Sequence, residues 1–298
     1  MRAVELKGLT YTYSAKTPFE KRALDNVDLA VEEGEFVGLI GATGSGKSTL
    51  IQHLNGLVKV QQGEVIVRGM NASDKKSLKK LRFTVGMVFQ YPEYQLFEDS
   101  VAKDVAFGPK NMKLDKEEVE RRVRRAMEVV GLPYEEFAER SPFELSGGEK
   151  RRAAIAGVIA MEPEILVLDE PVAGLDPVGR REILSLVRKL HEEVSPTVIM
   201  VSHYMDDIAE MADRIVALKE GKIVADGTPA EVFGAREKLA AAGLALPTAA
   251  RITDALAARG IELPRTIVTA RELADALAAY RTARRTATPA DADGEGED

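Results

Sequence analysis

The sequence predicts an α/β protein whose central sheet is largely parallel, and three observations support this fold class. A glycine-rich loop at residues 41–49 lies between an apolar, strand-like run and a helix-like segment. Short apolar runs recur at 165–168, 198–201 and 215–218, as expected for strands that are buried on both faces. Helix-like segments separate these strands, and such alternation indicates a parallel sheet with helices on both sides.

The bulk composition of the chain excludes several classes of protein. With 298 residues and 45% hydrophobic content, it can bury a full core and carry a small additional part. No apolar run approaches the roughly 18 to 20 residues that cross a bilayer, and no signal-like segment is present, so we expect a soluble, non-secreted protein. The chain has no cysteine for disulfides or thiolate metal sites, and its net charge of −7 argues against nonspecific nucleic-acid binding.

The first part of the chain is predicted to form short strands at 3–6, 9–13 and 26–31, the last with alternating apolar and polar residues. Tyr13 ends the second strand, directly before a polar loop. An aromatic residue at such a place either stacks on an adenine ring or is an ordinary surface tyrosine. The spacing alone favours neither interpretation.

The glycine-rich loop matches G-x-x-x-x-G-K-[ST] in the context that this motif requires, which is a strand, the loop and a helix. Its glycines let successive backbone N–H groups point inward, and the helix adds the positive end of its dipole, so the loop forms a phosphate cradle. Lys47 is expected to reach the β- and γ-phosphates, and Ser48 to hold Mg²⁺. The predicted phosphate-loop residues are Gly41, Ala42, Thr43, Gly44, Ser45, Gly46, Lys47, Ser48 and Thr49.

The segment after this loop is predicted to contain two more strands. Residues 62–70 form the first, and the basic run 74–82 is interpreted as a solvated helix face rather than a binding patch. Residues 83–90 form the second strand, which ends on Gln90, and sheet proteins of this class bind ligands at the carboxyl ends of strands. The aromatic loop 91–97 lacks core periodicity, which is typical of a functional loop.

Two longer helices are predicted in the middle of the chain. The first spans 115–131, with Asp115 as its cap and Gly131 as its terminator. The second follows Leu145-Ser146-Gly147-Gly148 and runs to Met161. With the loop before them, these helices make up a helical subdomain at about 91–161.

Two acidic residues, Asp169 and Glu170, follow the buried strand 165–168. Buried carboxylates are unfavourable unless they meet a cation or a hydrogen-bond donor, and Mg²⁺ held also by Ser48 is the natural partner. The strand 198–201 likewise ends in Ser202 and His203. A hairpin turning at Glu220-Gly221 follows.

Beyond Phe233 the composition shifts toward alanine and arginine. One short helix is predicted from Thr248 to Gly260, and a second begins at a capping box formed by Thr269 and Glu272. This part, residues 235–282, either packs against its own domain or forms a subunit contact. Residues 283–298 are predicted to be a disordered acidic tail.

Six motifs in a fixed order resemble those of the ATP-binding cassette (ABC) family over about residues 1–235. They are Tyr13, the phosphate loop, Gln90, LSGGEKRR at 145–152, LVLDEP at 166–171 with GLDP at 174–177, and His203. The LSGG motif is decisive, because phosphate loops occur in many enzymes whereas this second phosphate-binding helix start is specific to the family and its close relatives. The resemblance implies a P-loop NTPase with a RecA-like core, an antiparallel β subdomain and a helical signature subdomain, in an ABC ATPase domain at 1–234.

The resemblance also implies a dimer in which each subunit completes the site of the other. A serine and two glycines at a helix start leave backbone N–H groups free for an anion. In the family these groups bind the γ-phosphate of ATP held by the other subunit. The residues predicted to act across the dimer are Ser146, Gly147, Gly148, Glu149 and Asp176.

The chemical roles implied by the resemblance fall on residues near the strand ends. Glu170 would be the general base or water-orienting carboxylate, and His203 would contact the γ-phosphate and position Glu170. The predicted catalytic residues are Lys47, Gln90, Glu170 and His203, the predicted Mg²⁺ ligands are Ser48, Gln90 and Asp169, and Tyr13 is predicted to bind ATP. Glu149 and Val172 stand where many family members have glutamine and threonine.

A narrower resemblance is to the ATPase subunits of energy-coupling factor (ECF) transporters, and within these to the second of the two types. It rests on the runs 34–57, 88–112 and 145–177, on YPEYQLFE at 91–98, and on the short C-terminal helical part. It implies a peripheral ATPase on the cytoplasmic side of the cell membrane, with ATP and Mg²⁺ as cofactors, that drives uptake of a vitamin or transition-metal ion. Its expected partners are a second ABC ATPase, a transmembrane coupling subunit and a substrate-binding membrane subunit, with no nucleic acid.

In this interpretation the loop 91–98 contributes to a groove for the coupling helices of the membrane subunit, and residues 235–282 hold the two ATPases together. Glu93, Glu98 and Asp99 could favour a basic partner surface. Two alternatives remain open, namely the ATPase of another ABC importer, for amino acids, phosphate or metal, and a non-transport ABC ATPase of DNA repair or translation. A compact domain without a coiled-coil insert, and a single phosphate loop, argue against the second alternative.

Overall fold

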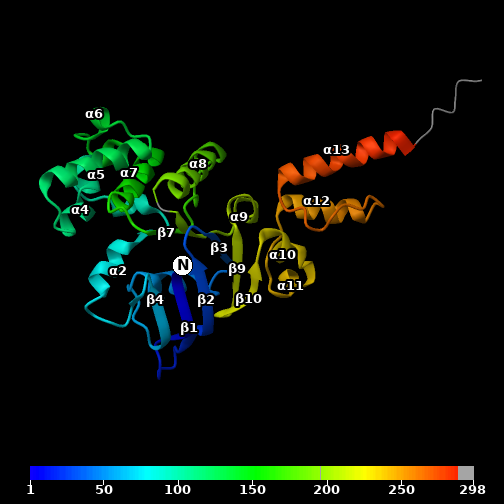
Figure 1. Cartoon of the computed structure of the whole chain (residues 1–298), viewed down its shortest axis with the longest axis horizontal. Coiled ribbons are helices and arrows are strands. Elements are labelled where there is room, and N and C mark those ends of the chain that lie inside the picture. The colour runs from blue at the N-terminus through cyan, green and yellow to red at the C-terminus, as the bar shows by residue number, and fades with distance from the viewer. Residues whose placement is uncertain (195, 288–298) are drawn as a thin grey trace, which may run out of the picture. The chain divides into compact units, whose positions relative to one another are not determined.

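The computed structural model describes residues 1–194 and 196–287 (Figure 1). Their contacts divide the chain into two compact units. The first comprises Met1–His203 with Met211–Thr228, and the second comprises Tyr204–Glu210 with the chain from Pro229 onward. The predicted acidic tail lies outside the described residues from 288 onward.

The core of the first unit is a six-stranded sheet with the order β10-β9-β3-β8-β7-β6. All neighbouring pairs are parallel except β10 and β9, so the predicted α/β class with a largely parallel sheet is confirmed. The strands are β3 (Phe36–Gly41), β6 (Val85–Val88), β7 (Ile165–Asp169), β8 (Thr197–Val201), β9 (Arg214–Lys219) and β10 (Lys222–Gly227). The hairpin predicted at Glu220-Gly221 joins the last two, and both turn residues have positive φ angles.

The strand order brings four polar chain segments to one edge of this sheet. The phosphate loop follows β3, and Gln90 follows β6. Asp169 and Glu170 stand at the end of β7, and His203 follows β8. Because these four strands are parallel and lie side by side, their carboxyl ends face the same edge.

A second, antiparallel sheet has the order β2-β1-β4-β5 and differs in detail from the prediction. It consists of β1 (Arg2–Tyr13), β2 (Lys21–Glu32), β4 (Gln62–Val67) and β5 (Met70–Asn71). The strands predicted at 3–6 and 9–13 form one strand, because a bulge at Gly8, with φ of 58°, shifts the register without ending the pairing. The single strand predicted at 62–70 is a hairpin, since Arg68 and Gly69 take the positive φ angles of a two-residue turn.

The strand predicted at 83–90 is also shorter than expected. Helix α2 (Leu78–Thr84) includes Phe83 and Thr84, and β6 begins only at Val85. Leu81 and Thr84 are both buried, and their spacing of three residues keeps one helical face inward up to the start of the strand. Gln90 therefore lies beyond the strand rather than at its last position.

Between β6 and β7 the chain forms a lobe of helices, and α8 follows between β7 and β8 (Figure 1). The predicted helices at 115–131 and after LSGG are confirmed as α5 and α7, and Asp115 caps the first by accepting the Glu118 N–H at 2.9 Å. The elements are η1 (Pro92–Gln95), α3 (Val101–Val105), α4 (Phe107–Asn111), α5 (Lys116–Val129), α6 (Tyr134–Phe137), η2 (Pro142–Glu144), α7 (Gly147–Ile159) and α8 (Pro177–Glu193). Helix α1 (Lys47–Leu54) lies directly after the phosphate loop.

The second unit is helical. It contains most of α9 (Met205–Met211), with α10 (Pro229–Gly234), α11 (Arg236–Ala241), α12 (Thr248–Ala257) and α13 (Ala270–Ala287). The capping box predicted at Thr269 and Glu272 is present, and α13 continues past residue 282, where the prediction had placed the end of the helical part. Among the described helices, none is both long enough and apolar enough to cross a bilayer.

Candidate nucleotide site

Two glycines of the phosphate loop, Gly41 and Gly46, have no room for a side chain. Gly46, at φ of 109°, is the N-cap of α1, and a Cβ there would lie 2.4 Å from the carbonyl oxygen of Ala23. A Cβ on Gly41 would lie 2.4 Å from the hydroxyl of Ser45. The loop is therefore packed tightly between its own strand and β2, with its N–H groups at the start of a helix.

Lys47 lies across this loop. Its ammonium group donates hydrogen bonds to the carbonyl oxygens of Gly41, at 2.7 Å, and Ala42, at 3.1 Å. Burial lowers the pKa of Lys47, while the negative charges of Glu170 and Asp169 act in the opposite direction. A half-buried ammonium group with only carbonyl partners is well prepared to receive anionic phosphate oxygens.

The carboxylate of Asp169, the last residue of β7, contacts the first turn of α1. The Ser48 side chain hydrogen-bonds this carboxylate, and burial, followed by the charge of Glu170, raises the pKa of Asp169. A buried carboxylate whose pKa is raised by burial and by a neighbouring carboxylate fits a site for a divalent cation. No group of three or more His, Cys, Asp or Glu side chains within the described residues forms a metal cluster, and Mg²⁺ typically uses one or two protein ligands beside substrate phosphates.

Glu170 is held in an unusual backbone conformation at this edge. Its φ angle is 51°, and its N–H donates to the carbonyl of Val201 at 3.0 Å. Nδ1 of His203 lies 2.7 Å from Oε2 of Glu170, yet this buried oxygen accepts no well-directed hydrogen bond within the described residues. A carboxylate oxygen with spare accepting capacity is suited to bind and orient a water molecule.

Tyr13 and Gln90 lie at the margins of the site. The Tyr13 hydroxyl is 3.2 Å from Oγ1 of Thr49, in the first turn of α1, and the ring of Tyr11 meets the Tyr13 ring edge to face at 4.8 Å. Tyr13 remains 40% exposed. Gln90 is exposed beyond the end of β6.

The second predicted phosphate site, at the start of α7, is fully formed but open. Ser146 is the N-cap, and a complete capping box joins it to Glu149, whose carboxylate accepts the Ser146 N–H at 2.7 Å. This hydrogen bond is the main reason why the pKa of Glu149 is lowered. Gly147 and Gly148 are exposed, and a Cβ on either would meet no atom within 4 Å. Asp176 is likewise an N-cap, since it accepts the Gly179 N–H at 2.7 Å at the start of α8.

One functional candidate, Arg151, was missed in the sequence. Its side chain is only 2% exposed and donates to both carboxylate oxygens of Glu93, at 2.8 and 3.1 Å. Glu93 is therefore paired within the chain, and the preference of the groove at the loop 91–98 for a basic partner surface stays a prediction. A signal existed, because Arg151 stands four residues before Ile155 and eight before Ile159, on the buried face of α7.

Comparison with known proteins places the chain in a family. The profile of the ABC transporter family matches residues 24–173. The energy-coupling factor transporter ATP-binding protein EcfA2 of Clostridium perfringens is 52% identical over 276 residues, which cover 92% of this chain and 97% of that protein. EcfA2 of Clostridium tetani is 50% identical over 268 residues, covering 90% and 93%.

Solved structures give the same result. The structure of cbiO1 from Clostridium perfringens, part of the ABC transporter complex cbiONQ, has a TM-score of 0.72 and 37% identity, covering 86% of this chain and 99% of that one. A dimeric, post-hydrolysis state of the ATP-binding cassette MJ0796 bound to ADP and Pi has a TM-score of 0.66 and 33% identity, covering 76% and 98%. The chain therefore belongs to the ABC transporter family and, within it, to the ATP-binding proteins of energy-coupling factor transporters, which are ATPases coupled to transport.

Proposed function

We propose that this protein, on the cytoplasmic side of the cell membrane, uses hydrolysis of MgATP to drive uptake of a vitamin or a transition-metal ion. It acts as one of two ATPase subunits, attached to a transmembrane coupling subunit and a substrate-binding membrane subunit. The single observation that supports the reaction is that a hydroxyl, two carboxylates and an imidazole lie together at one edge of the sheet. The hydroxyl of Ser48 bonds the Asp169 carboxylate, and Glu170, the next residue, lies 2.7 Å from His203.

Each group at this edge has a distinct task in the proposed reaction. Lys47 exchanges its carbonyl partners for the β- and γ-phosphate oxygens. Ser48 and Asp169, with Gln90, hold Mg²⁺, which when bound neutralises charge developing on the phosphates. Glu170 orients or deprotonates the attacking water through its carboxylate, whose Oε2 accepts no well-directed hydrogen bond within the described residues, and His203 keeps that carboxylate in place.

The chain supplies only half of each composite site. The open helix start at Ser146 to Gly148 has no packing role of its own, which supports its use by the nucleotide of a second subunit. Asp176 approaches the same partner from the start of α8. Hydrolysis is thereby linked to closure of two subunits around ATP.

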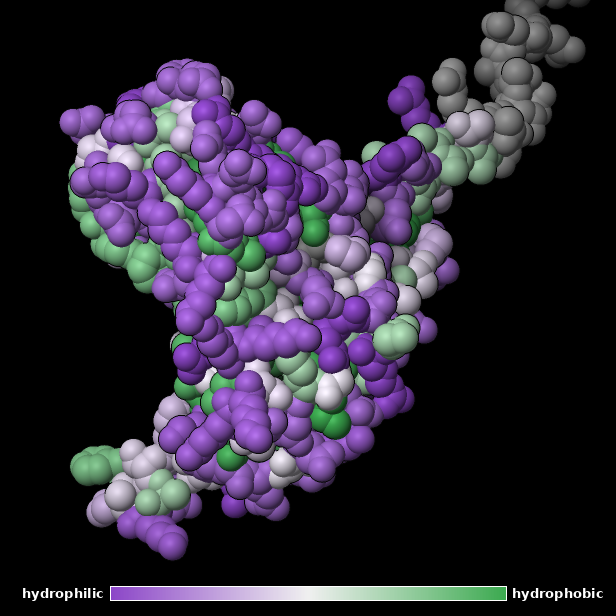
Figure 2. All heavy atoms as spheres, turned by 60° about the vertical axis from the view of Figure 1, so that its left-hand side comes forward, coloured by the Kyte–Doolittle hydropathy of each residue, from purple (hydrophilic) through white to green (hydrophobic). Residues whose placement is uncertain are grey.

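The membrane subunit docks in a groove of about 400 Å³ on the first unit. Its lining comes from α2, the loop 91–98, α4 and α7, and Phe97 and Phe107 stand there edge to face at 5.0 Å, both largely exposed. Figure 2 looks onto this side, where apolar side chains in green lie in the hollow below the helical lobe. An open apolar groove with exposed aromatic anchors suits an amphipathic helix.

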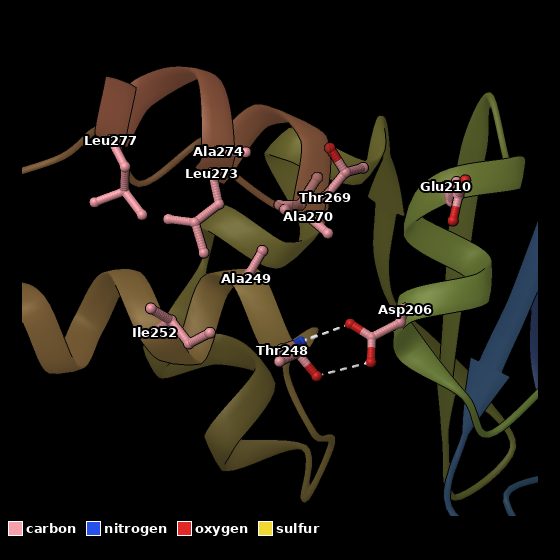
Figure 3. A pocket seen from close by; sticks show the side chains of 11 residues that line it. Asp206, Glu210, Thr248, Ala249, Ile252, Thr269, Ala270, Leu273, Ala274 and Leu277 are labelled. Carbon is pink, nitrogen blue, oxygen red and sulfur yellow. Dashed lines mark hydrogen bonds between the residues drawn. The ribbon is translucent and has the colours of Figure 1, made fainter. Parts of the chain in front are cut away.

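The second unit provides a contact between the two ATPase subunits. Helices α12 and α13 line a groove of about 300 Å³, to which Asp206 also contributes (Figure 3). The Asp206 carboxylate is held in place because it accepts hydrogen bonds from both the N–H and the hydroxyl of Thr248. Ile252 and Leu277 face this groove and are not fully covered. In this proposal residues 1–234 are the ATPase domain, and 235–282 are the dimerisation part.

The function is tested by transport. The protein is co-expressed with its membrane subunits, and the complex is reconstituted into vesicles that contain MgATP. We expect uptake of a labelled vitamin or of Co²⁺ or Ni²⁺ that stops with the Glu170→Gln variant. Hydrolysis by the wild-type complex without uptake of any compound in a panel of vitamins and metal ions would contradict the proposed substrate class.

A further inference from the structure

The buried guanidinium of Arg151 joins two segments of the first unit that are far apart in sequence. On one side it holds the carboxylate of Glu93, which lies in the loop 91–98 and is 18% exposed. On the other side its Nη1 donates to the carbonyl oxygens of Pro171, at 3.2 Å, and Ala173, at 2.9 Å. One side chain thus ties the aromatic loop to the turn that follows Glu170.

That turn leads directly to the catalytic carboxylate. The N–H of Ala173 donates to the carbonyl of Glu170 at 3.1 Å, so Ala173 is bonded to Arg151 through its oxygen and to Glu170 through its nitrogen. Tyr91 makes a second link, because its ring packs so closely on Gly174 that a Cβ there would lie 3.1 Å from it. The loop is therefore linked to the residues flanking Glu170 by hydrogen bonds and by packing.

We propose that Arg151 is a positioning residue that couples the loop 91–98, at the docking groove, to the orientation of Glu170. The proposal rests on the function above, in which that groove receives the membrane subunit and Glu170 acts on the attacking water. When the membrane subunit holds the loop in this position, Glu93 binds the guanidinium, which in turn donates hydrogen bonds to the Pro171 and Ala173 carbonyls. When the loop shifts, these hydrogen bonds break and Glu170 loses the backbone support that its positive φ angle requires.

An arginine is needed at this position because linking the Glu93 carboxylate to two backbone carbonyls requires several hydrogen-bond donors in a fixed plane. The guanidinium serves a carboxylate and two carbonyls at once, in a site with almost no exposure to water. A lysine ammonium keeps the charge but offers one donor centre, so it can stay with Glu93 or with the carbonyls. Arg151→Lys is therefore the sharpest variant, because it leaves the charge of the buried pair intact.

The test compares the pair Arg151 and Glu93 with a matched pair on the same helix. Arg152 lies next in α7 and contacts Glu182 at 3.2 Å, in an ion pair that is more exposed than that of Arg151, with the two side chains 27% and 57% exposed. Arg151→Lys, Glu93→Gln and their double variant are set against Arg152→Lys and Glu182→Gln. ATP hydrolysis is measured for the ATPase subunits alone and for the full complex in vesicles, with the KM for ATP and the melting temperature.

We expect Arg151→Lys to lower kcat of the full complex by about 10- to 100-fold, because a small misplacement of a catalytic group has effects of that size. The KM for ATP should stay within about twofold, and the stimulation of hydrolysis by the membrane subunits should fall toward none. Glu93→Gln should act in the same direction, and the double variant should be no worse than Arg151→Lys, since the two residues work as a unit. The Arg152 and Glu182 variants should behave as wild type.

Three outcomes would overturn the proposal. The first is an unchanged kcat and stimulation in Arg151→Lys. The second is a loss that is additive with Glu93→Gln. The third is a loss that is matched by a fall in melting temperature and occurs equally with and without the membrane subunits. Glu170→Gln, assayed in parallel, distinguishes failure of the proposed function from failure of the coupling role. If Glu170→Gln still hydrolyses ATP, the proposed function fails. If Glu170→Gln is inactive but Arg151→Lys is normal, only the coupling role is rejected.

Discussion

The phosphate loop and the start of α7 are both helix N-termini suited to anions, yet the chain surrounds them very differently. In the loop, added Cβ atoms on Gly41 and Gly46 would meet protein atoms at 2.4 Å, and the Ser45 carbonyl accepts the N–H of Gly221 at 2.9 Å. At the start of α7, Gly147 and Gly148 have no neighbour within 4 Å of such an atom. The phosphate loop is packed against its own chain, so its glycines are needed for folding. The start of α7 is left open, so its glycines are needed only for the nucleotide that we propose a second subunit brings to it.

The largest expected effect is on ATP hydrolysis, from a substitution beside the site that the chain completes itself. Glu170→Gln removes the base but keeps the shape, so hydrolysis should fall by about 10²- to 10⁴-fold. MgATP binding should be retained, because the phosphate loop is untouched, and subunits should accumulate as closed dimers. Steady-state hydrolysis, ATP binding and gel filtration with MgATP measure these effects. Undiminished hydrolysis would remove Glu170 from its assigned role.

Alanine at one glycine of each site separates folding from function. In Gly46→Ala, the methyl group meets the Ala23 carbonyl while the backbone stays at φ of 109°. We therefore expect the free energy of unfolding to fall by about 1 to 3 kcal/mol and ATP binding to be lost. In Gly148→Ala, the methyl group points into open space within a helix, so stability should rise by about 0.5 to 1 kcal/mol.

Hydrolysis should nevertheless fall in Gly148→Ala, because the methyl group narrows the space that the partner's nucleotide must enter. Thermal unfolding without nucleotide measures the stability of both variants, and hydrolysis by the assembled ATPase pair measures function. A destabilised Gly148→Ala protein, or a stable Gly46→Ala protein that binds ATP normally, would remove the contrast between a self-completed and an open site.

The smallest expected effect is a pair of opposite pH dependences. Burial raises the pKa of Asp169, so the folded protein holds that proton more strongly, and the stabilising contribution is present at low pH and lost as pH rises through the raised pKa. The Ser146 N–H lowers the pKa of Glu149, so its contribution is present at neutral pH and lost as pH falls through the lowered pKa.

Without nucleotide, Asp169→Asn should therefore raise the melting temperature at neutral pH, and Glu149→Gln should lower it slightly. As pH falls, the Asp169→Asn difference should shrink through the raised pKa toward the ordinary carboxyl range near ~4, whereas the Glu149→Gln difference should persist down to that range and shrink only below it. Thermal unfolding from neutral to acidic pH provides the measurement. Shifts of the same sign, or shifts that do not change with pH, would show that the two carboxylates are not in the contrasting environments described above.

Local patterns predicted the elements that depend on neighbouring residues. The phosphate loop, the cap of α5 at Asp115 and the capping box at Thr269 involve hydrogen bonds over three or four residues, and all three are present. Errors arose where pairing between distant segments decided the outcome. The bulge at Gly8 keeps β1 whole only because β2 and β4 flank it.

The amino-acid sequence by itself determined the strand-loop-helix motif, the open signature start, the alternation that makes a parallel sheet and, through these, the ABC family. These features follow from chain-local hydrogen bonding and from the periodicity of apolar residues. The family resemblance implied that His203 positions Glu170, but only the tertiary structure decided that Arg151 binds Glu93, Pro171 and Ala173 at once. Contacts between residues tens of positions apart depend on the order of strands in the sheet and on which face of a helix is buried, and spacing along the chain does not encode either directly.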